Sequence, residues 1–181
     1  MKKFEEKTIE SETIFEGKVV QLQVDRVKLP NGKESHREMI KHPGAVAVIP
    51  VTSDNKIVLV EQYRKPLERS LVEIPAGKLE EGEPPEKTAH RELEEETGYL
   101  ASEMTYITSF YTSPGFADEI IHLYLATGLK KADEPLGTDE DEFVEIMECT
   151  LEEAQKLINE KKIYDAKTAY ALLYLSVMKN S

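Results

Sequence analysis

Glutamates crowd one short stretch of this 181-residue chain, between Gly77 and Tyr99. The stretch reads GKLEEGEPPEKTAHRELEEETGY, and glycines stand near both of its ends. Like charges one helical turn apart repel each other, so this density of negative charge has a cost. Carboxylate oxygens, together with water and substrate phosphates, are the ligands that Mg²⁺ takes in proteins. The stretch therefore predicts a site for hard divalent cations. The alternative is a solvated acidic helix, which charge runs commonly form.

Helical spacing brings three of these carboxylates together. If residues 85–97 form a helix, Glu92 and Glu96 lie one turn apart, one above the other. Glu95 then lies beside them, three residues after Glu92. The three side chains would line one edge of the helix, close enough to share divalent cations through their oxygen atoms.

The sequence also predicts where this helix begins and ends and which of its faces is buried. Pro85 suits the first turn, where its missing N–H costs nothing, and Gly98 suits the left-handed position that ends a helix. Ala89 and Leu93 form a narrow apolar stripe that would face the core. We therefore expect a helix over residues 85–97 that this stripe anchors.

The full spacing of the stretch resembles the signature of the Nudix hydrolases. The matching positions are Gly77, Glu83, Arg91-Glu92, Glu95-Glu96 and Gly98. Tyr99 stands where an aliphatic residue is usual, a departure that packing can absorb. The resemblance covers roughly Pro43 to Lys179. It implies an α/β/α sandwich and metal-dependent hydrolysis of a nucleoside diphosphate that is linked to another group.

The resemblance also implies a set of metal ligands. Glu92 and Glu96 would be the core ligands, and Glu95 would be a second or bridging ligand and a catalytic residue. The carbonyl of Ala76 is the expected backbone ligand. Mg²⁺ is the expected metal, with Mn²⁺ as the alternative, and it would neutralise charge that develops on the phosphates. Arg91 and Glu83 are expected to brace the loop and the helix rather than to touch substrate.

Features outside the signature resemble the ADP-ribose pyrophosphatase branch of the family. They are Pro114, fifteen residues past the signature, the segments 60–64 and 73–77, and the acidic segment 140–145. The acidic segment supplies a glutamate base in that branch. We take Glu142 as the base, with Glu140 as second choice, and a solvated acidic loop as the alternative.

Two residues of the implied strand pair are candidates for binding substrate. Arg64 could clamp the diphosphate, because a guanidinium matches phosphate oxygens bidentately. Alternatively, Arg64 forms a surface ion pair with Glu61 or Glu68 and does not bind substrate. Glu73 could accept a hydrogen bond from a ribose hydroxyl.

The two ends of the substrate are harder to place. The terminal ribose pocket is expected at Ser113, Pro114, Gly115 and Phe116, although Pro114 could be a simple turn residue. In related enzymes the adenine site draws on N-terminal strands of a second subunit, often with a tryptophan, which this chain lacks. Arg37 could stack on the base instead or be an ordinary strand charge. Phe15 and Tyr63 are further candidates for contacting the adenine, but for each of them a place in the core is the favoured interpretation.

Composition narrows the partners. The formal charge of −12 disfavours nucleic acid and anionic membranes, which would be repelled. Cys149 is the only cysteine, which allows no intrachain disulfide and fits a reducing cytoplasm. The N-terminal residues have no apolar core, so we expect no signal peptide, and no apolar run reaches the length of a membrane span.

The remaining pattern predicts strands in two regions. Alternation from Thr8 to about Ile40 predicts strands with a hairpin turn at Pro30-Asn31-Gly32. The apolar run 45–51 predicts a buried strand. Further strands are expected at 56–63, 70–75, 104–111, 120–127 and 143–148.

Two helices are expected near the C-terminus. Thr150 and Glu153 form a capping box that opens the first of them. The second runs from about Asp165 to Met178, with Ala169, Leu172, Leu173 and Val177 at helical spacing.

These elements predict an α+β fold. We expect a Nudix-like α/β/α sandwich with a mixed sheet, over residues 43–181, and a small N-terminal antiparallel β domain, over residues 1–42. The N-terminal strands lack a partner layer within one chain, which favours an exchanged homodimer in which they also form part of the substrate site.

The leading functional hypothesis is metal-dependent hydrolysis of ADP-ribose to AMP and ribose 5-phosphate. A nucleotide-sugar such as GDP-mannose, or an oxidised nucleoside triphosphate, is the alternative substrate. A binding module without catalysis is a third interpretation, which the intact cluster of Glu92, Glu95 and Glu96 disfavours.

Overall fold

The computed structural model describes residues 3–134, 136–137 and 143–179. The chain divides into two compact units. The first consists of Met1–Gly44 and Phe110–Ile121, and the second of Ala45–Ser109 and His122–Ser181. None of the helices in the described part of the chain combines the length and the apolarity of a membrane span.

The first unit is built on a three-stranded antiparallel sheet in the order β1-β2-β3. Its strands are β1 (Lys7–Glu16), β2 (Gln21–Lys28) and β3 (Glu34–Lys41). The hairpin between β2 and β3 turns at the predicted place, where Gly32 has a left-handed φ of 84°. Every residue of β1 is exposed, so this strand has no covering layer among the described residues.

The segment Phe110–Ile121 joins the first unit by pairing with the end of β3. The Ile40 N–H donates to the carbonyl of Phe116 at 2.7 Å, and the Asp118 N–H donates to the carbonyl of Ile40 at 3.1 Å. The Asp118 carboxylate also accepts hydrogen bonds from the Lys41 ammonium and from the His42 N–H, each at 2.9 Å. Sequence reasoning had not joined this segment to the N-terminal strands.

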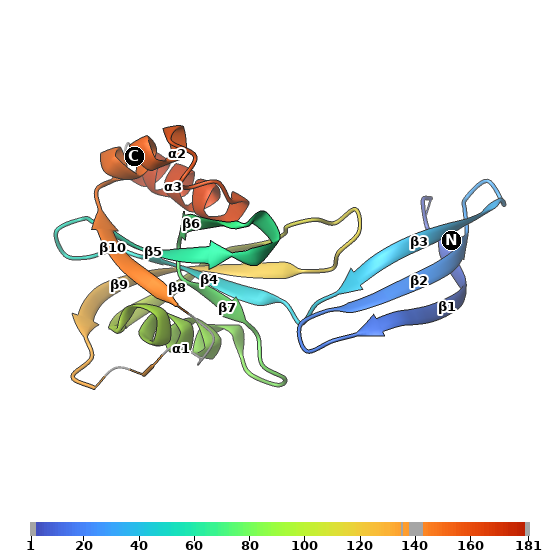
Figure 1. The fold of residues 1–181 in the computed structure, drawn as a ribbon, viewed down its shortest axis with the longest axis horizontal. Helices are drawn as coiled ribbons and strands as arrows, with labels where there is room; N and C mark the ends of the chain where they lie inside the picture. The colour runs from blue at the N-terminus through green and yellow to red at the C-terminus, as the bar shows by residue number, and fades with distance from the viewer. Residues whose placement is uncertain (1–2, 135, 138–142, 180–181) are drawn as a thin grey trace. The chain divides into compact units, whose positions relative to one another are not determined.

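In its described residues, the second unit holds two sheets and three α-helices (Figure 1). A four-stranded sheet has the order β7-β4-β9-β8, and a three-stranded sheet has the order β10-β5-β6. The elements are β4 (Ala45–Pro50), β5 (Ile57–Arg64), a 3₁₀ turn (Lys65–Leu67), β6 (Arg69–Glu73), β7 (Ala76–Lys78), α1 (Pro85–Thr97), β8 (Tyr99–Tyr111), β9 (Ile120–Lys131), β10 (Val144–Cys149), α2 (Leu151–Asn159) and α3 (Ala166–Lys179). Figure 1 shows α1 on one side of these strands and α2 with α3 on the other. The predicted α/β/α sandwich is confirmed.

The core beneath α1 uses the predicted stripe. Ala89 and Leu93 are fully buried, and they pack with valines of β4 and β5. Tyr99 lies in the same cluster, and its hydroxyl donates to the Glu148 carboxylate. This hydrogen bond, with burial, raises the pKa of Tyr99 to about 12. The departure from an aliphatic residue at this position is therefore absorbed by packing, as expected.

The boundaries of the helices agree with the sequence pattern. Helix α1 begins at Pro85, and Gly98 ends it with a φ of 65°. At α2, the Thr150 side chain accepts the Glu153 N–H at 3.2 Å, and the Glu153 carboxylate accepts the Thr150 N–H at 2.8 Å. The predicted helix and the predicted capping box are both confirmed.

The helix predicted from about Asp165 to Met178 is confirmed as α3, but the apolar residues named at helical spacing are not all buried. Leu172 is buried as expected, but Leu173 and Val177 are 62% and 58% exposed and Ala169 is also exposed. The buried face is instead formed by Thr168, Ala171 and Leu172. Apolar residues surround this helix on nearly every side, so their periodicity does not select one face.

Two aromatic residues read as core are exposed. Phe15 on β1 is 56% exposed and Tyr63 on β5 is 54% exposed. Strand β1 has no covering layer among the described residues, and Tyr63 lies near the end of β5, beyond the buried run Ile57–Val60.

Candidate metal and substrate site

Helix α1 packs a carboxylate directly against the short strand β7. Gly77 lies in the middle of β7, and a Cβ atom there would stand 1.9 Å from the carboxyl carbon of Glu92. Glu92 is only 7% exposed. The missing side chain at position 77 therefore forms a cradle in which the Glu92 carboxylate lies against the backbone.

Glu96 reaches the same strand one turn further along α1. Its Oε2 accepts a hydrogen bond from the Ala76 N–H at 3.2 Å, and the residue is 3% exposed. The structure thus brings the predicted ligands Ala76, Glu92 and Glu96 together at one edge of the helix.

Arg91 supplies the positive charge beside these carboxylates. Its Nη1 lies 2.9 Å from Glu92 Oε1 and 2.8 Å from Glu95 Oε2, and its Nη2 lies 3.3 Å from Glu83 Oε2. Burial alone would lower the pKa of Arg91, but Glu92 and Glu95 raise it above its ordinary value. Glu83 also accepts a hydrogen bond from the Thr88 hydroxyl at 2.9 Å, which ties the loop to the helix. These are the bracing contacts expected of Arg91 and Glu83.

The oxygen donors of Glu92, Glu95, Glu96 and the Ala76 carbonyl are of the kind that binds a divalent cation, although they do not converge on one point in this structure. Among the described residues, no group of three His, Cys, Asp or Glu side chains is arranged to hold a metal. The carboxylates of α1 turn to Arg91 and to the Ala76 N–H instead. Three glutamates and a backbone carbonyl are nonetheless oxygen donors of the kind that hard cations select, and the Gly77 cradle keeps one of them on the strand.

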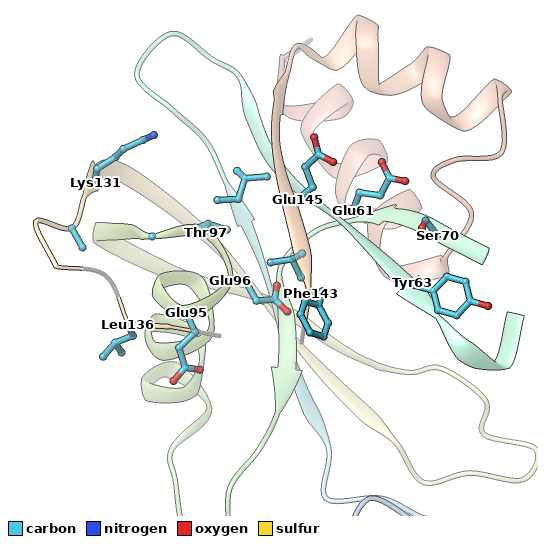
Figure 2. A pocket seen from close by; sticks show the side chains of 14 residues that line it. Glu61, Tyr63, Ser70, Glu95, Glu96, Thr97, Lys131, Leu136, Phe143 and Glu145 are labelled. Atoms are coloured by element: carbon cyan, nitrogen blue, oxygen red, sulfur yellow. The ribbon is translucent and has the colours of Figure 1, made fainter. Parts of the chain in front are cut away.

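A cavity of about 780 Å³ opens beside this helix (Figure 2). Glu95 and Glu96 line it from α1, while Glu61 and Glu145 line it from β5 and β10, where they are cross-strand partners. Phe143, which is 81% exposed, also lines the cavity (Figure 2). A cavity of a few hundred Å³ that mixes polar groups with an aromatic ring is typical of small-molecule sites.

Arg64 and Glu73 form a bidentate ion pair. Arg64 Nε lies 2.9 Å from Glu73 Oε1, and Arg64 Nη2 lies 2.8 Å from Glu73 Oε2. The alternative partners for Arg64 were Glu61 and Glu68, and the second of these binds Lys65 at 2.9 Å. The two predicted substrate residues therefore meet each other, across the antiparallel pair of β5 and β6.

A lysine that sequence reasoning missed completes this pair. Lys167, in the first turn of α3, donates to Glu73 Oε2 and to Asp165 Oδ1, the latter at 3.0 Å. Burial alone would raise the pKa of the Glu73 carboxyl, but Arg64 and Lys167 together hold it below its usual value. No sequence signal pointed to Lys167, because a single lysine at the start of an apolar helix has no characteristic spacing.

The other predicted substrate residues lie in the first unit. On β3, the Arg37 guanidinium binds Glu6 through two hydrogen bonds of 2.8 and 2.7 Å. Ser113, Pro114 and Gly115 form a turn in which the Ser113 carbonyl accepts the N–H groups of Phe116 and Ala117. The predicted bases Glu140 and Glu142 lie outside the described residues.

Comparison with known proteins places the chain in a family. The NUDIX domain model matches residues 41–171, which is more than half of the chain. The chain belongs to the Nudix family. The model of the nucleoside diphosphate sugar hydrolase N-terminal domain matches residues 6–40 of the same Nudix chain. Nudix hydrolases generally need a divalent metal, in agreement with the donor set on α1. The expectation of a Nudix enzyme is confirmed.

Two relatives of equal sequence identity carry different names. The Nudix chain is 64% identical over 178 residues to a methanol dehydrogenase activator of Bacillus methanolicus, covering 98% of this chain and 96% of that one. It is also 64% identical over 177 residues to an ADP-ribose pyrophosphatase of Bacillus subtilis (strain 168), with the same coverage. A crystal structure of an ADP compounds hydrolase has the same fold, with a TM-score of 0.84 at 21% identity, and covers 96% of this chain and 93% of its own.

Proposed function

We propose that this Nudix chain hydrolyses ADP-ribose to AMP and ribose 5-phosphate with Mg²⁺, and that Mn²⁺ is the alternative metal. The observation that carries the proposal is the Gly77 cradle, which holds Glu92 on the strand while Glu95 and Glu96 line the adjoining cavity. The Bacillus subtilis relative, an ADP-ribose pyrophosphatase at 64% identity, supports this choice of substrate. GDP-mannose, another nucleotide-sugar or an oxidised nucleoside triphosphate is the alternative within the same chemistry.

The proposed metal ligands are the Ala76 carbonyl, Glu92, Glu95 and Glu96. When bound, the cation supplies positive charge to the diphosphate oxygens and makes water more acidic. The chain itself positions the carboxylates that would bind the cation. The Ala76 N–H fixes the Glu96 carboxylate, and the Gly77 cradle fixes that of Glu92.

The reaction breaks the P–O–P anhydride by attack of water on one phosphorus, in line with the leaving phosphate. Glu142 is the proposed base that takes the proton from this water, with Glu140 as second choice. Arg64 is proposed to bind the diphosphate through N–H groups that Glu73 does not use. Glu73 keeps lone pairs that can accept a ribose hydroxyl, since each carboxylate oxygen accepts more than one hydrogen bond.

The first unit is proposed to bind the rest of the substrate. Arg37 would stack on the adenine, and Ser113, Pro114 and Gly115 would surround the terminal ribose. We further propose that the enzyme is a homodimer, which the exposed strand β1 supports. Nucleic acid and membranes are not among its proposed partners, and the proposed location is the cytoplasm.

A substrate panel tests the function. ADP-ribose, GDP-mannose and an oxidised nucleoside triphosphate are each mixed with the enzyme and Mg²⁺ or Mn²⁺, and the products are identified by chromatography. AMP with ribose 5-phosphate from ADP-ribose alone is the expected result. No release of AMP, or equal turnover of every nucleotide-sugar, would refute the proposal.

Two variants on one helix test the metal assignment. Glu96→Gln should lower kcat/KM by about 100-fold, the loss typical of a damaged metal site. Glu94→Gln makes the same change of charge on α1 away from the proposed ligands, so it should retain activity. Full activity of Glu96→Gln with Mg²⁺ present would exclude Glu96 as a ligand.

A third variant, Glu142→Gln, tests the proposed base. If it lowers kcat no more than Glu94→Gln does, Glu142 is excluded as the base.

A second candidate function is activation of a methanol dehydrogenase. The observation in its favour is the relative of that name, whose identity and coverage equal those of the pyrophosphatase relative. The test is to add the chain to a methanol dehydrogenase and measure alcohol oxidation. An unchanged rate would leave hydrolysis as the only supported function.

A further inference from the structure

Four side chains of the second unit form a row of alternating charges, which we call the ion chain: Asp165, Lys167, Glu73 and Arg64. Lys167 Nζ lies 3.0 Å from Asp165 Oδ1 and also donates to Glu73 Oε2. Glu73 in turn accepts both hydrogen bonds of Arg64. A single carboxylate oxygen, Glu73 Oε2, is therefore shared by two cations.

The ion chain is buried at Glu73, partly buried at Lys167 and Asp165, and most exposed at Arg64. The side chains of Glu73, Lys167 and Asp165 are 3%, 11% and 18% exposed, whereas that of Arg64 is 37% exposed. Burying a charge is costly unless it is paired, so Glu73, Lys167 and Asp165 depend on one another. Arg64 is the most exposed member, so its guanidinium is the group that can meet the phosphates of a substrate.

The start of α3 holds Lys167 in place. Asp165 Oδ1 accepts the Thr168 N–H at 3.1 Å, which caps the helix, and Thr168 Oγ1 accepts the Ile74 N–H at 3.0 Å. Ile74 directly follows Glu73, so the first turn of α3 is fixed to the residue next to the shared carboxylate. Lys167 therefore approaches Glu73 from a rigid element.

We propose that Lys167 is a positioning residue for substrate binding, which acts by sharing the Glu73 carboxylate with Arg64. The inference rests on the proposed function, because it takes Arg64 to bind the diphosphate. While Lys167 neutralises part of Glu73, Arg64 keeps positive charge to offer to phosphate oxygens. Without Lys167, the whole carboxylate charge acts on Arg64 and competes with the substrate for the same guanidinium.

The first test separates binding from turnover. Lys167→Met should raise the KM for ADP-ribose about tenfold, because the charge-assisted hydrogen bond from Arg64 to the diphosphate is weakened. It should change kcat by less than about twofold, because this hydrogen bond contributes to substrate binding and not to the chemical step. Lys179→Met, an exposed lysine of the same helix paired with Glu152 at 2.8 Å, is the matched control and should leave both constants unchanged. Lys167→Arg should restore most of the affinity. An unchanged KM in Lys167→Met, or a fall in kcat alone, would overturn the proposal.

The second test predicts a change of the opposite sign. Asp165→Asn removes the charge that competes for Lys167 but keeps a side chain that caps helices equally well. Lys167 then acts more strongly on Glu73, and KM should fall by about twofold. A structural role alone would make both variants worse, so a raised KM in Asp165→Asn would contradict the inference even if Lys167→Met failed to fold.

A double variant shows whether the effect passes through Arg64. In an Arg64→Met background, Lys167→Met should have no further effect on KM, since coupled residues are not additive. Additive effects would contradict the inference. Failure of the proposed function looks different, because the unmodified enzyme would then release no AMP from ADP-ribose.

Discussion

A single added methyl group at position 77 would overlap the Glu92 carboxylate, at 1.9 Å from its carbon and 2.0 Å from its Oε1. Real Cβ atoms do not approach other atoms so closely, so the helix or the strand would have to move. The spacing of the sequence signature predicted that Gly77 matters, but it did not say why. The physical reason is the cradle, and it depends on residues that lie fifteen positions apart in the chain.

Gly77→Ala should therefore weaken metal binding. Displacing Glu92 removes one oxygen donor from the proposed site, and we expect the affinity for Mn²⁺ to fall about 10- to 100-fold. Isothermal titration calorimetry with Mn²⁺ measures this without substrate. Gly32→Ala is the control, because it strains a left-handed turn of the first unit but meets no atom within 4 Å. Equal Mn²⁺ affinity of the two variants would contradict the cradle.

Residue types alone could not assign the partners of Arg64 and Glu73. Both were selected as substrate residues from the sequence, yet their mutual ion pair depends on the register of β5 and β6. Lys167 could not be predicted from the sequence either, because its contact with Glu73 joins residues that lie 94 positions apart. Short-range spacing finds groups on one helix, whereas contacts between distant segments require the fold.

At the scale of elements, α1 with its preceding loop behaves as one braced unit. Glu83 in the loop binds both Thr88 and Arg91 of the helix. Arg91 also bridges Glu92 and Glu95 and is the positive charge inside the acidic cluster. In the absence of metal, this arginine limits the repulsion between carboxylates on neighbouring turns.

Arg91→Gln should therefore make the fold depend more strongly on metal. Without metal, we expect the melting temperature to fall by about 5 °C relative to the unmodified chain. Mg²⁺ should restore part of this loss, so the rise in melting temperature on adding Mg²⁺ should be larger in the variant, because ligand binding stabilises the native state. Differential scanning calorimetry in EDTA and in Mg²⁺ measures both values. The same rise in both proteins would show that Arg91 and the metal do not share the carboxylates.

The elements themselves were predicted unevenly. Helix α1 and the start of α2 were placed to the residue, because proline, glycine and a capping box mark their ends. The helical spacing of apolar residues in α3 did not identify its buried face, and the three-residue strand β7, which carries Ala76 and Gly77, was not separated from β6. A strand so short has no periodicity of its own and exists because β4 pairs with it.

At the scale of the whole molecule, strand β1 presents apolar side chains that no described part of the chain covers. Each of its residues is exposed, and Ile9, Ile14 and Phe15 among them are between 43% and 56% exposed. Exposed apolar side chains on one strand are typical of a surface that another chain covers. The sequence suggested the same partner, a second copy, from the absence of a covering layer within one chain.

The enzyme should therefore sediment at twice the mass of one 20.6 kDa chain. Ile14→Lys should shift the protein towards monomer, since it places a charge in the proposed interface. Glu160→Lys, an exposed position at the end of α2 in the second unit, controls for added positive charge and should remain dimeric. Sedimentation velocity at several concentrations makes the comparison, and a monomeric unmodified protein would remove the dimer from the proposal.

The route of the backbone between the two units has a consequence for how this protein can be cut or recombined. The chain passes from one unit to the other three times, after Gly44, after Ser109 and after Ile121. Cleavage after Gly44 would leave the segment Phe110–Ile121 on the larger fragment, deprived of its hydrogen bonds to Ile40. The N-terminal strands are thus not a detachable module. A graft that moves them to another Nudix scaffold would have to carry a second, internal piece of chain with it.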